Sequence, residues 1–329
     1  MQIMDLPKPT AEQQAHSDRL RALIADEVRQ ANGALPFWRY MELCLYAPGL
    51  GYYSAGSRKF GADGDFVTAP ELGDVFAHCI AHALVPVLDA IGEDAAVFEI
   101  GGGSGAFAEQ ILLRLDALNQ LPSHYLLLEP SADLRERQRQ RLQQALRPAL
   151  FDRVQWLDGP PEQEWCGVLF ANEVLDALPT PRFVLRDGEV FEECVAMDAD
   201  GGFRRVDRPA DALLRAAVRH VERDRRRADT HARFGDGYRS EVLPQLPYWI
   251  QAVGGLMREG AMLFCDYGYP RAEFYSDDRS EGTLLCHYRH RVHHDPYLLV
   301  GLQDLTASVD FTALAEAGTH AGFELAGYC

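Results

Sequence analysis

The sequence lacks the paired cysteines that mark a zinc ribbon or a disulfide-stapled fold. Its seven cysteines are scattered and include no C-x-x-C pair. We therefore expect reduced, mostly buried thiols. The stretch CHYRHRVHHD holds His290, His293 and His294, but its interleaved arginines oppose a bound cation. A polar loop is the preferred interpretation, and no metal site is predicted.

Long apolar runs and clustered basic residues are also missing. No uninterrupted apolar stretch reaches the length of a membrane span, so none is expected. The first twenty residues lack the features of a secretory or organelle leader, which makes a cytoplasmic location the default expectation. A net charge of −17 argues against a nucleic-acid partner, and acids interrupt the one dense basic run, residues 219–229. Basic or arginine-containing partners suit this charge better.

From residue 95 onward, short apolar segments alternate with helical patterns. The expected strands are 95–100, 124–129, 154–157, 167–173 and 261–267, and the expected helices between the first three are 107–118 and 134–146. This alternation predicts an α/β fold with a parallel, doubly wound sheet.

The segments around this core have different patterns. The chain begins with a predicted helix capped at Ser17, followed by a segment rich in glycine and aromatic residues, 46–76. That segment is either a poorly ordered surface or a structured binding segment, and its aromatic residues favour the second. Residues 180–247 are too many for one crossover and predict an inserted β-ribbon with Asp-Gly turns, then helix. The expected units are 1–88, 89–179 (core), 180–247 (insertion) and 248–329 (core).

A glycine-rich turn lies between the first expected strand and its helix. Four of the five residues from Gly101 to Gly105 are glycine. In a doubly wound sheet, ligands bind beyond the carboxyl ends of the strands, where this turn lies. The spacing Gly101-x-Gly103-x-x-Ala106 fits a dinucleotide fingerprint, although glycines can also serve only a tight turn.

Acidic residues at the strand ends indicate the ligand. Glu99 ends a buried strand, and Glu129 ends the next one, where it can accept both hydroxyls of a ribose. Asp158 follows the third strand and is expected to meet an adenine amino group. No Lys or Arg lies close to the glycines to bind a pyrophosphate. These acidic surroundings favour S-adenosyl-L-methionine, with its sulfonium and ammonium charges, over an anionic dinucleotide.

Six motifs in one order narrow the prediction: YAPGLGYYS, GDFVTAPELGDVFA, FEIGGGSG, NEVLDALP, FCDYGY and QDLTASVDF. Together they resemble the MidA-like family of class I methyltransferases, from about Tyr46 to the C-terminus. That family includes the mitochondrial complex I assembly factor, which methylates an arginine of a partner protein. The resemblance implies a Rossmann-like class I methyltransferase fold, S-adenosyl-L-methionine as donor, and a protein arginine as acceptor, for example in a respiratory-complex subunit.

The resemblance also assigns residues. Its donor loop and its motif after the fourth strand match Gly101, Gly103, Gly105, Asn172, Glu173 and Asp176. Its N-terminal signature matches residues 64–71, which we expect to fold over the donor with Thr68 and Glu71 close to it. The alternative is a surface loop without a ligand role.

Two carboxylates are the predicted acceptor site. A guanidinium has a pKa above 12 and poorly nucleophilic nitrogens, so carboxylates must orient it and localise its charge. Glu173 and Asp176 are three residues apart, which puts both on one face if the segment turns helical. Asp266 and Tyr267 end the next strand and are expected to complete the wall. The alternative is that Glu173 or Asp176 caps a helix or pairs with a structural arginine.

The end of the sequence departs from the resemblance. A class I methyltransferase sheet normally ends in a hairpin of strands six and seven, whereas the last segment here, residues 323–329, resembles strand six. We expect a missing, replaced or partner-supplied seventh strand. An unpaired apolar edge associates readily, which makes a homodimer a further expectation.

Other functions compete with protein-arginine methylation. A small-molecule methyltransferase would use the insertion and the glycine-rich segment as a lid over a metabolite. A non-catalytic assembly factor would retain only the donor pocket. An NAD-dependent oxidoreductase ranks last because of the acidic surroundings of the glycines.

Overall fold

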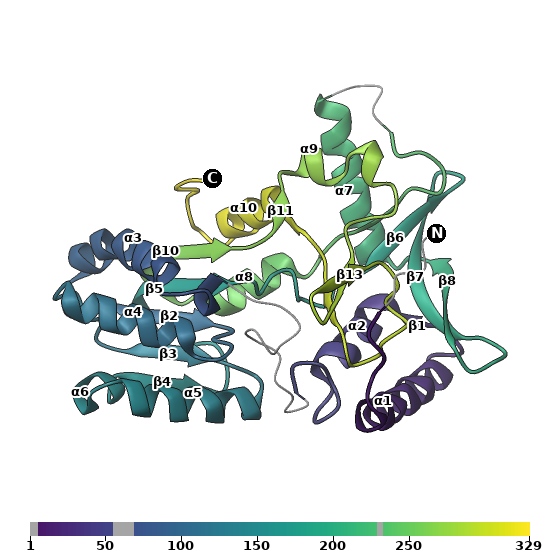
Figure 1. Cartoon of the computed structure of the whole chain (residues 1–329). Coiled ribbons are helices and arrows are strands. Elements are labelled where there is room, and N and C mark those ends of the chain that lie inside the picture. Colours follow the sequence, from purple (N-terminus) through teal and green to yellow (C-terminus); the bar gives the residue numbers. More distant parts are fainter. Residues whose placement is uncertain (1–5, 55–68, 229–232) are drawn as a thin grey trace.

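A five-stranded parallel sheet forms the core of one half of the molecule, on the left in Figure 1, in the computed structural model, which describes residues 6–54, 69–228 and 233–329. Its strand order is β10-β5-β2-β3-β4, and all of its neighbouring strands are parallel. The strands are β2 (Ala96–Ile100), β3 (Tyr125–Leu128), β4 (Val154–Leu157), β5 (Trp165–Asn172) and β10 (Met257–Cys265). The predicted α/β fold and all five predicted strands are confirmed.

Helices cover both faces of this sheet. On one face, apolar side chains of α3 (Val75–Ile91), α4 (Ala106–Ala117) and α5 (Ala132–Ala145) share a core with the strands and with the short α6 (Pro148–Phe151). In that core, the Phe107 ring stacks on Phe170 of β5 with centroids 4.3 Å apart. On the other face, α8 (Leu246–Gly254) packs on the sheet and α10 (Phe311–His320) packs on α8. No described helix has the length and apolar character to cross a bilayer.

The predicted insertion forms a second, antiparallel sheet. Its ribbon is β6 (Arg182–Arg186), β7 (Glu189–Met197) and β8 (Phe203–Pro209), followed by α7 (Ala212–Ala228) and β9 (Arg239–Glu241). Asp187 and Gly188 connect β6 to β7 with φ of 50° and 78°, the left-handed conformation expected of an Asp-Gly hairpin turn. From the N-terminal part of the chain, β1 (Leu35–Pro36) pairs with β7.

The N-terminal helices share a core with a late part of the chain. These helices are α1 (Ala11–Gln30) and α2 (Phe37–Tyr46), and they pack with β7 and with the small sheet β12 (Leu285–Tyr288), β13 (Arg291–His293) and β14 (Asp304–Thr306). The segment after α2 is thereby brought beside β14. The remaining elements are η1 (Ala69–Glu71), β11 (Gly268–Tyr269), α9 (Arg271–Phe274), η2 (Asp277–Arg279) and β15 (Val309–Asp310).

Two local predictions are wrong. The first helix begins at Ala11, because Thr10 and Gln13 form a capping box ahead of Ser17. Ser17 lies inside α1, where its hydroxyl donates to the Val300 carbonyl oxygen at 2.8 Å. Residues 323–329 form no strand, and Tyr328 packs its ring on Phe311 instead. Among the described residues the sheet therefore stops at β10, as the prediction of a missing seventh strand requires.

Candidate functional site

A cavity of about 640 Å³ lies at the carboxyl edge of the central sheet. Its walls come from the turns after β2, β3 and β5, from α2 with the loop that follows, and from the start of β14. The described residues that line it include eight carboxylates and no Lys, Arg or His. The eight are Glu42, Glu71, Glu99, Glu129, Asp133, Glu173, Asp176 and Asp304.

The glycine turn forms part of the wall of this cavity. Gly101 and Gly103 line it, and their φ values are 71° and 52°. Residues other than glycine adopt this left-handed backbone conformation only at an energetic cost. A Cβ on Gly101 would lie 2.8 Å from Val174 Cγ2. The Gly103 carbonyl oxygen accepts from Gln138 Nε2 at 2.9 Å, which fixes the turn against α5. Gly105 is the N-cap of α4 and does not line the cavity.

The acids at the ends of β2 and β3 both line the cavity. Glu99 is buried, and its Oε2 accepts from the Tyr125 hydroxyl at 2.7 Å. Burial raises the pKa of Glu99 to about 7. Glu129 accepts from the Ser131 N–H at 2.9 Å and from Gln138 Nε2 at 3.3 Å. Both carboxylates are therefore held by neighbours at the positions that the sequence indicated.

The N-terminal signature is described only in part. Thr68 and the rest of residues 64–68 lie outside the described residues, so their predicted place over the donor stays a prediction. Glu71 lines the cavity, and its carboxylate accepts from the Ser104 hydroxyl of the glycine turn. The Pro70 carbonyl oxygen accepts from Gln110 Nε2 of α4 at 3.2 Å. The described end of the signature is thus joined to the glycine turn and its helix.

Asn172 at the end of β5 lines the cavity, and the segment after β5 brings Glu173 and Asp176 to it as a turn, not as a helix. The reason is Asp266, whose Oδ2 accepts from the N–H groups of Val174 at 3.1 Å and Leu175 at 2.9 Å. It lies 3.4 Å from the N–H of Asp176. A carboxylate at the end of β10 thus replaces the hydrogen bonds that a helix would supply.

Besides Gly105, three predicted site residues do not join the cavity wall. Asp266 faces the backbone of the turn after β5 and holds that turn in place. Tyr267 is mostly exposed, and its hydroxyl donates to Glu173 Oε1 at 3.3 Å. The Asp158 side chain is 92% exposed and pairs with Arg135 at 2.6 Å. The turn after β4 therefore points its carboxylate into solvent.

Asp176 carries the clearest sign of a ligand-binding role. Its side chain is buried, and its Oδ1 has no hydrogen-bond partner among the described residues. Burial raises the pKa of Asp176 well above its usual value, and the charges of Asp266, Asp304 and Glu173 raise it further. Burial likewise raises the pKa of Glu173. A buried, unpartnered carboxylate oxygen is costly, and a cationic ligand would offset that cost.

Tyr46, Tyr53 and Asp304 are among the residues of this wall that sequence reasoning missed. All three lie in the motifs YAPGLGYYS and QDLTASVDF, from which no site residue was assigned. The aromatic residues of the first motif and the acid of the second were the available signals. Nothing local, however, places these motifs side by side.

Replacing Glu99 by Gln is expected to stabilise the ligand-free protein at pH 8. Because the folded-state pKa of about 7 lies above the ordinary value of 4.5, the ionised carboxylate weakens folding, and stability rises as the pH falls toward 4.5. The Gln side chain keeps an acceptor for the Tyr125 hydroxyl, so the variant should gain up to about 3 kcal/mol at pH 8 and less at pH 5. Denaturant unfolding at both pH values measures this. Equal destabilisation at both would contradict it.

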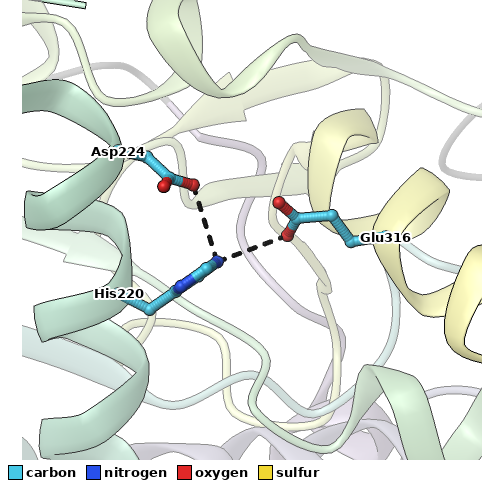
Figure 2. A group of neighbouring side chains, drawn as sticks. All are labelled: His220, Asp224 and Glu316. Carbon is cyan, nitrogen blue, oxygen red and sulfur yellow. Dashed lines mark ion pairs between the residues drawn. The ribbon is translucent and has the colours of Figure 1, made fainter. Parts of the chain in front are cut away.

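A second cavity, of about 290 Å³, lies between α7 and α10. Figure 2 shows His220 and Asp224 of α7 facing Glu316 of α10, with the His220 Nε2 atom 3.5 Å from a carboxylate oxygen of each. These three side chains could hold a metal ion by their spacing alone. The Arg271 guanidinium, however, already pairs with both carboxylates and with Asp310. We interpret the group as an ion-pair network that fixes the insertion to the core.

Comparison with known proteins agrees with this architecture. Residues 79–329 match a family model described as "Putative S-adenosyl-L-methionine-dependent methyltransferase". A crystal structure from Burkholderia thailandensis, bound to S-adenosyl-homocysteine, is 41% identical with a TM-score of 0.87, over 97% of this chain and 80% of that one. A mitochondrial protein of Drosophila melanogaster, named as a protein arginine methyltransferase NDUFAF7 homolog, is 26% identical over 94% of this chain and 72% of its own length. The Mus musculus protein arginine methyltransferase NDUFAF7 is 27% identical over 87% and 66%.

The family match covers most of the chain, and the similar crystal structure contains the product that remains when S-adenosyl-L-methionine has lost its methyl group. The glycine turn and the acidic cavity are the features that such a donor requires. The chain therefore belongs to this family and is a methyltransferase of the class I fold that uses S-adenosyl-L-methionine.

Proposed function

We propose that this enzyme methylates an arginine side chain of a partner protein. The observation that carries the proposal is the cavity itself, whose described lining includes eight carboxylates and no basic side chain. A bound donor has two positive groups and one carboxylate, so it leaves most of this negative charge for a second cation. The names of the relatives from Drosophila melanogaster and Mus musculus, both protein arginine methyltransferases, support the same acceptor.

The glycine turn suits the donor. Gly101 and Gly103 have no side chains there, so their backbone is open to close approach by the ligand. Glu129 has the position at the end of β3 from which a carboxylate accepts ribose hydroxyls. Glu99 and Glu71 flank the turn and would face the cationic part of the donor. We assign donor binding to these residues, and we leave Asp158 out of the set.

The turn after β5, which carries Glu173 and Asp176, suits the acceptor. Bound S-adenosyl-L-methionine supplies an electrophilic methyl group, whose carbon bonds to the acceptor nitrogen as the sulfur–carbon bond breaks and the sulfur keeps the electron pair. Glu173 and Asp176 would bind the guanidinium and keep its charge on the nitrogens that do not react. The methylated nitrogen then loses a proton, and Asp176 is the proposed acceptor for it, since its raised pKa makes its carboxylate a stronger base.

The same charge argues against a lysine acceptor. An amine attacks through a lone pair, which it has only after losing its proton. Buried carboxylates favour the protonated ammonium and so would hold lysine in its unreactive form. A guanidinium is cationic before the transfer, and release of one proton after the transfer leaves the methylated group with a single positive charge. The acidic wall therefore favours binding without blocking attack.

Two competing functions remain distinguishable from this proposal. A small-molecule methyltransferase would use the same cavity for a cationic metabolite. A non-catalytic assembly factor would bind the donor without transferring the methyl group. A respiratory-complex subunit as the partner, a homodimer and a cytoplasmic location stay predictions from the sequence.

Labelled donor identifies the acceptor class directly. The protein is incubated with S-adenosyl-L-methionine carrying a labelled methyl group and with a cell extract, and proteins and metabolites are separated. We expect label in one or a few proteins and, after digestion, on methylated arginine in their peptides. Label confined to metabolites would support the small-molecule alternative. Donor binding without any transfer would support the assembly factor.

A further inference from the structure

Two tyrosines and an aspartate form the cavity wall that sequence reasoning did not find. Tyr46 ends α2 and Tyr53 lies in the following loop; their rings stack with centroids 5.5 Å apart and planes inclined by 21°. Asp304 begins β14 and is buried. The Tyr53 hydroxyl lies 3.0 Å from each carboxylate oxygen of Asp304, and the Leu305 N–H donates to its Oδ1 at 3.0 Å. Asp304 is thus held in one orientation.

This wall is joined to the turn that carries Asp176. The Ala307 N–H donates to the Asp176 carbonyl oxygen at 2.9 Å. The Tyr46 hydroxyl donates to the Ala177 carbonyl oxygen, also at 2.9 Å. The two carboxylates are close enough that the charge of Asp304 helps to raise the pKa of Asp176. Repulsion between buried carboxylates is relieved when a cation binds between them.

We propose that Asp304 is an acceptor-binding residue, which together with Asp176 binds the guanidinium of the substrate arginine against the rings of Tyr46 and Tyr53. A guanidinium presents a planar fork of donors that matches carboxylates, and its face packs on aromatic rings. The wall offers both kinds of partner in one place. This inference rests on the proposed arginine methylation and adds the residues that select arginine.

Calorimetry with a small probe tests the inference apart from turnover. Nα-acetyl-arginine amide is titrated into protein saturated with S-adenosyl-homocysteine, and Nα-acetyl-citrulline amide serves as the neutral probe of nearly the same shape. We expect the wild type to bind the arginine probe at least about tenfold more tightly than the citrulline probe. Asp304→Asn should lose most of that preference while it keeps its affinity for S-adenosyl-homocysteine. Glu27→Gln, which removes a charge outside the cavity, is the matched control.

A second variant decides the case if Asp304→Asn does not fold. Tyr53→Phe keeps the stacked ring but removes the hydroxyl that orients Asp304, and it should weaken the arginine probe severalfold. Wild-type arginine preference in a folded Asp304→Asn protein, or in Tyr53→Phe when the first variant is unfolded, overturns the inference. Arginine methylation would still stand if labelled arginine is found in the extract. If the wild type does not prefer arginine and the label lies on another acceptor, both proposals are wrong.

Discussion

Replacing Glu173 by Gln and Asp176 by Asn together is expected to cut methyl transfer at least about a hundredfold, with S-adenosyl-homocysteine still bound, because both proposed acceptor carboxylates lose their charge. Asp176 is the buried residue whose Oδ1 is unpartnered among the described residues, and Glu173 lies on the same turn. Neither side chain belongs to the proposed donor-binding set. Single-turnover rates report the transfer step, and calorimetry reports donor-site affinity. Wild-type transfer by the double variant would end the assignment.

The pH dependence of acceptor binding gives an independent check. Burial raises the pKa values of Glu173 and Asp176, so both carboxylates take up protons at a higher pH than an exposed acid does. Acceptor affinity should therefore fall as the pH is lowered through this raised range, and the wild-type KM for the acceptor should rise. The amide side chains of the double variant do not titrate. Its weak affinity for the acceptor should therefore not fall further as the pH is lowered.

Glu173 also allows stability to be separated from chemistry. Its φ of 52° is left-handed, a conformation that glycine adopts more easily. Glu173→Gly is therefore expected to keep or raise the thermal unfolding midpoint while methyl transfer falls, because the carboxylate is lost. A Gly variant that unfolds at a much lower temperature would show that the carboxylate serves the fold.

Replacing Gly103 by Val is expected to abolish measurable donor binding while the fold is kept. Gly103 lines the cavity with φ of 52°, and its carbonyl oxygen is already fixed by Gln138. A β-branched side chain at this position adds bulk where we place the donor against the backbone. It also strains the backbone by about 1–2 kcal/mol. Calorimetry with S-adenosyl-homocysteine, on protein whose folding is checked by circular dichroism, measures the loss.

Two controls separate this effect from general damage. Gly188→Val places the same side chain at a left-handed position, φ 78°, in a hairpin turn with open space around it. It should lose similar stability and keep donor affinity. Asp158→Asn should also keep donor affinity, since its carboxylate is exposed and outside the cavity. Unchanged affinity in a folded Gly103→Val protein would move the donor site away from the glycine turn.

The parts of the site that lie next to strands could be predicted from the sequence. Gly101, Glu99 and Glu129 follow or end apolar runs, and parallel strands bring their carboxyl ends to one edge. Asp158 satisfied the same rule and yet points into solvent beside Arg135. The rule locates the end of a strand but not the direction of the side chain that follows. That direction depends on the turn that each connection adopts.

The sequence by itself determined the parallel sheet, the glycine turn, the inserted ribbon and the acidic character of the cavity, because these follow from local periodicity and composition. Only the tertiary structure decided the acceptor wall. Tyr53 and Asp304 are 251 residues apart, and the shared core of α2 and β14 brings them together. The tertiary structure also placed Asp266 where it holds the turn after β5. Contacts at such separations depend on how whole elements pack, which no local pattern records.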